Sequence, residues 1–184
     1  MEATGLIGEL GVSVRPFHEE DLPVYFESLD RLDLFGPYDH RVFRSRQEMK
    51  KEFDEDGFIG KDNVRLVVDV AGRAVGAIGY RPHQWPRGMA PVMADIGLGF
   101  WDPSDRGKGY GRAATQLLVD YLFGELHYHR LTAGTHEDNV PARKTLEACG
   151  FKFEGISREL FYYKARWHDY AEYALLEDEW RARR

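Results

Sequence analysis

The stretch Arg106-Gly107-Lys108-Gly109-Tyr110-Gly111-Arg112 is the most informative part of this sequence. It follows a β-rich segment, Met93 to Trp101, and opens a segment from Gly109 to Phe123 whose apolar residues recur at helical spacing. Its glycines permit backbone conformations closed to other residues and let a ligand lie against the main chain. The first N–H groups of a helix, and its dipole, favour an anion there. With three cations nearby, the stretch predicts a pyrophosphate-binding loop.

Two common nucleotide-binding motifs fit this loop poorly. The phosphate loop of nucleotide triphosphatases needs Gly-Lys followed by Ser or Thr, and here Gly109 and Tyr110 follow Lys108. The dinucleotide fingerprint needs a final glycine where Arg112 stands, near the start of a βαβ unit. A tight turn without a ligand is the structural alternative, and a second motif weighs against it.

The second motif runs from Asn139 to Phe151, where Val140 to Cys149 predicts a short helix with Pro141 in its first turn and Gly150 as its stop. With both motifs, the sequence resembles the GNAT superfamily of acyl-CoA-dependent N-acyltransferases. The positions that match the family's two motifs are Arg106, Gly109, Gly111, Asn139, Ala142, Gly150 and Phe151. Downstream residues resemble the branch that acetylates ribosomal-protein N-termini, which also includes enzymes of small-molecule amines.

The resemblance implies acetyl-CoA as the cofactor. It assigns cofactor binding to Phe100, Trp101, Arg106, Gly107, Lys108, Gly109, Tyr110, Gly111, Arg112, Asn139, Arg143 and Lys144. Asn139 is also explained as a plain helix N-cap. For Arg143 and Lys144 the alternative is a solvated helix face.

The order of predicted elements indicates an α+β, or mixed α/β, fold. The expected strands are Val12–Phe17, Val64–Val70, Ala74–Tyr80, Met93–Trp101, Arg130–Thr135, one starting at Phe151 and Phe153, and Tyr170–Leu176. The expected helices are His18–Leu29, one from the Ser45–Glu48 capping box to Gly57, Gly109–Phe123, Val140–Cys149 and the tail Glu177–Arg184. The resemblance implies a twisted, mostly antiparallel central sheet with a splayed parallel pair and helices on both faces. No linker or repeat divides the chain, so we expect one GNAT domain, 1–184.

The implied reaction is attack of a neutral amine on the acetyl thioester, which needs a proton acceptor. Asp95 is the first candidate base, because a carboxylate within an apolar strand is unusual, and Glu159 is the second. The alternative for Asp95 is a carboxylate at a strand edge or on the surface, and the alternative for Glu159 is an ion pair with a neighbouring arginine. The family's usual acids are missing, since Leu146 and Ala142 stand in their places. Tyr162 could substitute, although packing is its simpler role.

The acceptor remains open on the sequence alone. Candidate walls of its site are Phe35, Tyr38, Trp85 and Tyr162. An aromatic wall suits an alkylamine or a peptide terminus. The leading interpretation is an N-acetyltransferase that acts on a primary amine of a small molecule or peptide, and Ala142 favours small molecules because it departs from the ribosomal-protein pattern. The next interpretation is an N-terminal acetyltransferase of ribosomal proteins. A non-catalytic acyl-CoA-binding module is the alternative from another class.

The composition excludes several other classes. A formal net charge of −6 argues against nucleic-acid and anionic-membrane partners. The single cysteine, Cys149, allows no intrachain disulfide, and the histidines show no zinc spacing, so we expect a reducing compartment and no metal. Neither a signal peptide nor a long apolar run is visible, which favours a cytoplasmic protein, as a monomer or homodimer.

Overall fold

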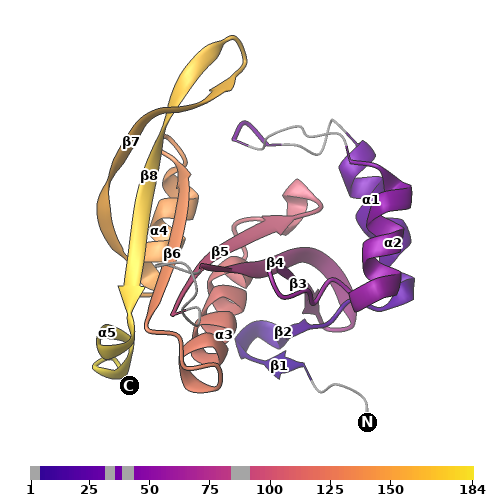
Figure 1. Ribbon diagram of the computed structural model, residues 1–184, viewed down its shortest axis with the longest axis horizontal. Helices are drawn as coiled ribbons and strands as arrows, with labels where there is room; N and C mark the ends of the chain where they lie inside the picture. Colours follow the sequence, from indigo (N-terminus) through magenta and orange to yellow (C-terminus); the bar gives the residue numbers. More distant parts are fainter. Residues whose placement is uncertain (1–4, 32–35, 39–43, 84–91) are drawn as a thin grey trace. The chain divides into compact units, whose positions relative to one another are not determined.

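The computed structural model describes residues 5–31, 36–38, 44–83 and 92–184 (Figure 1). The strands are β1 (Leu6–Ile7), β2 (Val12–Arg15), β3 (Val64–Val70), β4 (Arg73–His83), β5 (Met93–Phe100), β6 (Arg130–His136), β7 (Lys152–Tyr163) and β8 (Arg166–Leu176). The helices are α1 (Leu22–Asp30), α2 (Arg46–Asp56), α3 (Tyr110–Gly124), α4 (Val140–Ala148) and α5 (Glu177–Arg181). No helix among the described residues combines the length and apolar character needed to cross a membrane.

Within those ranges, the eight strands form one sheet in the order β1-β2-β3-β4-β5-β6-β8-β7. The pairs β1–β2, β2–β3, β3–β4, β6–β8 and β7–β8 are antiparallel. Among the described residues, β5 and β6 form a parallel pair, over the three positions from Met93–Arg130 to Asp95–Thr132. The predicted fold class, a mixed α/β fold with a mostly antiparallel sheet and one parallel pair, is confirmed.

The chain divides into two compact units. Unit 1 comprises Met1–Arg81 and Leu98–Leu118, and unit 2 comprises Pro82–Gly97 and Val119–Arg184.

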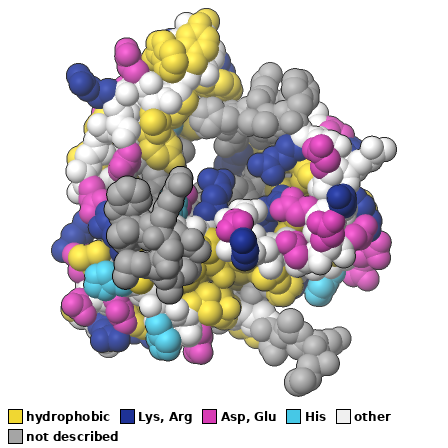
Figure 2. All heavy atoms as spheres, in the orientation of Figure 1, with side chains coloured by type: hydrophobic (Ala, Val, Ile, Leu, Met, Phe, Trp, Pro, Cys, Tyr) yellow, Lys and Arg dark blue, Asp and Glu magenta, His cyan; other side chains and the backbone are white. Residues whose placement is uncertain are grey.

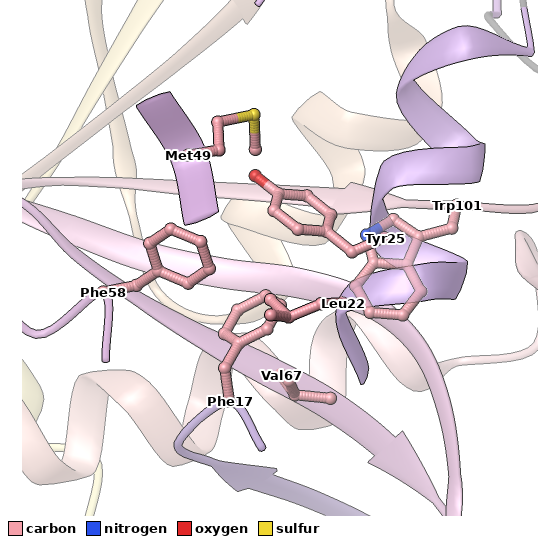
Figure 3. Packing of buried hydrophobic residues seen from close by; sticks show 7 residues of the cluster. All are labelled: Phe17, Leu22, Tyr25, Met49, Phe58, Val67 and Trp101. Atoms are coloured by element: carbon pink, nitrogen blue, oxygen red, sulfur yellow. The ribbon is translucent and has the colours of Figure 1, made fainter. Parts of the chain in front are cut away.

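Unit 1 has an aromatic core (Figure 3). Its buried members are Phe17, Leu22, Tyr25, Met49, Phe58, Val67 and Trp101. The Phe17 ring centroid lies 5.1 Å from those of both Tyr25 and Phe58. Such tilted and edge contacts add to the stabilisation that comes from the buried apolar area. Leu22 and Tyr25 both lie on α1, three residues apart, so the predicted spacing does define the buried face of this helix.

Local signals set the ends of α2 and the turn between β3 and β4 in unit 1. The Ser45 Oγ accepts the N–H of Glu48 at 3.2 Å, and α2 ends at Gly57, whose φ is +64°. Ala71 and Gly72 have φ values of +52° and +85°, which is the type I′ pattern expected of a tight hairpin. This turn joins two of the predicted strands into the β3–β4 hairpin, with β4 beginning at Arg73, one residue before the predicted start.

Unit 2 contains a hairpin that is longer than the sequence predicts. β7 and β8 reach Tyr163 and Arg166, so that the turn consists of Lys164 and Ala165. Both turn residues have positive φ, +48° and +60°, although neither is glycine. A hairpin turn of this kind usually contains Asn or Gly, and that signal is absent here. The predicted tail helix is shorter than expected, because α5 ends at Arg181. Cys149 is buried and forms no disulfide with the described residues.

Candidate cofactor and catalytic site

The glycine-rich loop lies between a short 3-10 turn, Pro103–Asp105, and the first turn of α3. Gly107 and Gly109 have φ values of +75° and +86°, in the left-handed region that favours glycine. Both are exposed, and a Cβ built on Gly107 would meet no atom within 4 Å. The loop is therefore an open main-chain surface at the start of a 15-residue helix. A phosphate group fits this arrangement of N–H groups and helix dipole.

A buried carboxylate lies at the base of this loop. The side chain of Asp105 is 2% exposed and accepts two hydrogen bonds from Arg73, at 2.9 and 2.7 Å. Lys108 Nζ lies 3.3 Å from the same carboxylate. The hydrogen bond from Arg73 is the largest influence on Asp105 and holds its pKa below the usual value, despite burial. Lys108, predicted as a cofactor ligand, is thus partly engaged by the protein itself.

No motif or spacing in the sequence predicts the Arg73–Asp105 pair. Arg73 lies 32 residues before Asp105, at the start of β4. Its guanidinium donates two hydrogen bonds to the Asp105 carboxylate and so holds the Pro103–Asp105 turn, which precedes the glycine-rich loop. Of the other predicted cations, Arg106 is partly buried, whereas Arg112 is exposed.

Close backbone packing fixes β4 against the end of β5. A Cβ built on Gly76 would lie 2.4 Å from the carbonyl oxygen of Gly99. The N–H of Trp101 donates to the carbonyl of Val75 at 3.0 Å. Trp101 is 9% exposed, and its ring belongs to the core of unit 1. The structure therefore uses both the ring and the amide of Trp101 internally, which leaves Phe100 as the better candidate of the two for cofactor contact.

The last part of β5 presents bare backbone. Gly97, Leu98 and Gly99 are exposed, although they lie within a strand of the sheet. Cβ atoms built on Gly97 and Gly99 would meet nothing within 4 Å. The recorded pairing of β5 with β6 ends before them, at Asp95 and Thr132. Glycine in a strand marks such places of close approach by a ligand or another backbone.

Asp95, the first candidate base, is partly buried at the last recorded position of the parallel pair. Its Oδ1 accepts a hydrogen bond from Thr132 Oγ1 at 3.2 Å. The hydroxyl orients the carboxylate, so Asp95 is held in one place by β6. This geometry suits a proton acceptor.

The second motif is anchored within unit 2. The Asn139 Oδ1 accepts the N–H of Ala142 at 3.3 Å, so Asn139 is the N-cap of α4, and its Nδ2 donates to Thr135 at 3.0 Å. Arg143 donates to the Tyr173 hydroxyl at 2.9 Å and to the Glu137 carbonyl at 3.2 Å. These contacts account for the Arg143 side chain without a cofactor.

Four of the remaining candidates lie in the described part of the chain. Lys144 is exposed on α4. Glu159 is exposed, in a bulge of β7 with a φ of +51°, and its N–H donates to Asp169 at 2.8 Å. Tyr162 is 61% exposed. Tyr38 is partly buried. The candidates Phe35 and Trp85 lie outside the described residues.

A pair of buried histidines, His136 and His168, lies near the start of the second motif. His136 Nδ1 accepts the N–H of Asp138 at 3.1 Å, so the hydrogen-bond pattern places its hydrogen on Nε2. That N–H donates to His168 Nδ1 at 2.6 Å, and His168 Nε2 donates to the Tyr163 carbonyl at 2.9 Å. This series of hydrogen bonds ends on the backbone carbonyl of Tyr163. It therefore anchors the β7–β8 hairpin rather than passing a proton onward.

Comparison with known sequences identifies a family. Residues 12–152 match the acetyltransferase (GNAT) domain. An uncharacterized N-acetyltransferase, p20 of Bacillus licheniformis, is 30% identical over 115 residues, which are 62% of each chain. The spermidine N(1)-acetyltransferase of Vibrio cholerae is 30% identical over 78 residues, 42% of this chain and 45% of that one. This chain's matches span between 44% and 62% of the lengths of the first three curated relatives.

Solved structures share the fold. The spermidine N-acetyltransferase from Vibrio cholerae, in complex with CoA and spermine, superposes with a TM-score of 0.78 at 21% identity, over 92% of this chain and 98% of that one. RimL, a ribosomal L7/L12 alpha-N-protein acetyltransferase in complex with CoA, gives 0.77 at 16% identity, over 96% and 99%. With the domain match covering most of its length, the chain belongs to the GNAT acetyltransferase family.

Proposed function

We propose that this chain is an N-acetyltransferase that moves the acetyl group of acetyl-CoA to a primary amine. The observation that carries the proposal is the open, positive-φ loop at Gly107 and Gly109, ahead of α3 and clamped by Asp105. Its main-chain N–H groups would hold the diphosphate of the coenzyme. The bare backbone from Gly97 to Phe100 would lie along the pantetheine arm.

When bound, acetyl-CoA supplies an activated acyl group as a thioester. Asp95 would accept a proton from the incoming ammonium group, so that the neutral nitrogen attacks the carbonyl carbon. The C–N bond then forms, the C–S bond breaks, and a second proton passes from the nitrogen to the departing thiolate, which leaves as the free thiol. Holding both reactants in line supplies much of the rate gain, which matters because Leu146 replaces the usual acid.

The relatives indicate amines as the class of acceptor. The names of two relatives refer to spermidine and to ribosomal targets. We therefore propose a primary amine of a polyamine, another small molecule or a peptide N-terminus. We also propose that both units serve a single acetyltransferase domain, since the family match runs through residues of each.

The cofactor proposal is tested by the substitution Gly107→Ala, with Gly72→Ala as its matched control. Both glycines have positive φ, +75° and +85°, and at both an added Cβ meets nothing within 4 Å. Each substitution should cost about 1 kcal/mol of folding free energy through backbone strain. Only Gly107→Ala should weaken CoA binding in calorimetry, by about tenfold. Equal CoA affinity in the two variants would refute the loop assignment.

The catalytic proposal is tested by Asp95→Asn, with Thr132→Val as the positioning control. Thiol release from acetyl-CoA is followed with a panel of polyamines, small amines and peptides. Asp95→Asn should keep CoA affinity and lose about 100-fold in turnover, and Thr132→Val should lose less. Undiminished turnover in Asp95→Asn would remove Asp95 as the base. CoA binding without turnover of any amine would instead favour a non-catalytic module.

A further inference from the structure

The end of the β7–β8 hairpin projects beyond its neighbour in the sheet. The pairing of β6 with β8 stops at His136–Tyr170, whereas β7 and β8 continue to pair from Phe161–His168 to Tyr163–Arg166. We call residues 160–168 the ribbon tip. A two-stranded ribbon is marginal in water by itself, so this one needs an anchor.

The anchor occupies one face of the ribbon tip. Phe161 and His168 form one cross-strand pair, and the Phe161 ring stacks on His168 with centroids 5.5 Å apart. His168 is 6% exposed and receives the hydrogen bond from His136. These contacts within unit 2 hold the ribbon tip in a defined position.

The opposite face carries unburied aromatic side chains. Tyr162 and Trp167 form the next cross-strand pair, with ring centroids 5.3 Å apart, and they are 61% and 57% exposed. Leu160 adds a third apolar side chain at 54% exposure. Figure 2 shows apolar side chains gathered at the free end of this ribbon. Single exposed apolar residues need no explanation, but a contiguous group on a rigid element marks an interaction surface.

Cations without a carboxylate partner accompany these aromatics, and Lys164 Nζ lies 5.2 Å from the centroid of the Tyr163 ring. Arg158, Lys164 and Arg166 are exposed, and among the described residues none of the three has a carboxylate within ion-pair distance. The ribbon tip itself contains two of these cations and no carboxylate, in a chain whose net charge is −6. Tyr, Trp and Arg are the residues that most often dominate binding energy at protein interfaces.

From this combination we propose that the ribbon tip is a docking surface for an acidic protein segment that carries apolar side chains. A second copy of this chain fits less well, because a two-fold contact through the tip would oppose Lys164 and Arg166 with themselves. A nucleic acid also fits less well, since Glu159 and Asp169 flank the tip and the whole chain is acidic. The proposal does not depend on the acetyltransferase activity or on CoA.

The test is a selection from a displayed library of random 16-residue peptides on the immobilised full chain. Selected peptides should have a net negative charge and contain aromatic or aliphatic residues. Their affinities are then measured by fluorescence anisotropy against two double variants, Tyr162→Ser with Trp167→Ser, and Lys164→Glu with Arg166→Glu. Each should weaken binding by about tenfold or more.

Matched controls separate docking from folding. Ile7→Ser removes an apolar side chain that is 77% exposed elsewhere, and Lys144→Glu reverses an exposed cation on α4. Both controls should leave the affinity unchanged, and the charge variant should keep the wild-type unfolding midpoint. If the variant with serine at Tyr162 and Trp167 does not fold, the peptide affinity of the variant with glutamate at Lys164 and Arg166 tests the proposal.

Four results would overturn the proposal. The selection enriches no peptide, or it enriches neutral or basic ones. The variants bind selected peptides as tightly as the wild type. A labelled 20-nucleotide uridine RNA binds more tightly than the peptides. Sedimentation shows a self-association that the substitutions at Tyr162 and Trp167 abolish, which assigns the surface to a second copy.

Discussion

Removing the guanidinium of Arg73 should destabilise the protein although Arg73 lies on the surface. In the variant Arg73→Ala, the Asp105 carboxylate, 2% exposed, loses both of its hydrogen bonds from this residue. Breaking a buried ion pair by deleting one partner costs about 3–5 kcal/mol. Two features reduce that value here, because the Arg73 side chain is 59% exposed and Lys108 stays 3.3 Å from the carboxylate. We therefore expect a loss of about 2 kcal/mol.

The loss should depend on pH in a defined direction. The hydrogen bond from Arg73 lowers the pKa of Asp105 in the folded protein. A carboxyl group with a lowered folded pKa stabilises the fold above its unfolded pKa, about 3.9, and that contribution disappears as the pH falls through the folded value. The difference between wild type and Arg73→Ala should thus be full at pH 7 and shrink below about pH 4.

Urea unfolding followed by tryptophan fluorescence at pH 7, and then at decreasing pH, measures both effects. Arg81→Ala is the control, since Arg81 is exposed on the same strand, and it should change the free energy of unfolding by less than about 0.5 kcal/mol. If Arg73→Ala lowers the free energy of unfolding no more than Arg81→Ala does, the stabilising role of the Arg73–Asp105 pair is refuted. A loss that stays constant down to pH 3 would refute it as well.

Three further substitutions test other parts of the structure. Gly76→Ala should cost about 2–3 kcal/mol by chemical denaturation, because its Cβ would fall 2.4 Å from a backbone oxygen of β5; a neutral result would contradict the close packing. Tyr173→Phe should cost about 1–2 kcal/mol, since its hydroxyl bonds to two charged side chains, and an unchanged unfolding midpoint would count against that network. Asp21→Asn should cost about 2 kcal/mol of folding free energy at pH 7 and little below about pH 4. Burial raises the pKa of Asp21, but the hydrogen bonds from Arg15 and from the His18 N–H outweigh it, so that the pKa is lowered overall. A cost that grows as the pH falls would refute this.

Local patterns in the sequence predict much of this fold. The hairpin at Ala71 and Gly72, the cap at Ser45 and the buried face of α1 all follow from signals that lie within a few residues of each other. Helix and turn chemistry act over such short ranges, so a single sequence carries them.

Features that depend on distant parts of the chain were not predictable. The clamp joins Arg73 to Asp105, and no spacing rule links residues so far apart. The end of the β7–β8 hairpin could not be predicted because Lys164 and Ala165 adopt positive φ without glycine, and the hairpin is anchored there by the hydrogen bond between His136 of β6 and His168. For Asn139 the sequence left a cap and a cofactor ligand open, and the structure shows the cap.

The discontinuity of unit 1 has a consequence for the nascent chain. Six members of its aromatic core precede residue 68, but the seventh, Trp101, arrives with the second segment, Leu98–Leu118. Domains tend to fold as units while synthesis proceeds from the N-terminus. The rings of Phe17, Tyr25 and Phe58 must therefore leave the ribosome before the residue that completes their packing has been translated. Protease resistance of unit 1 should appear only in arrested chains long enough to expose Leu118 outside the exit tunnel.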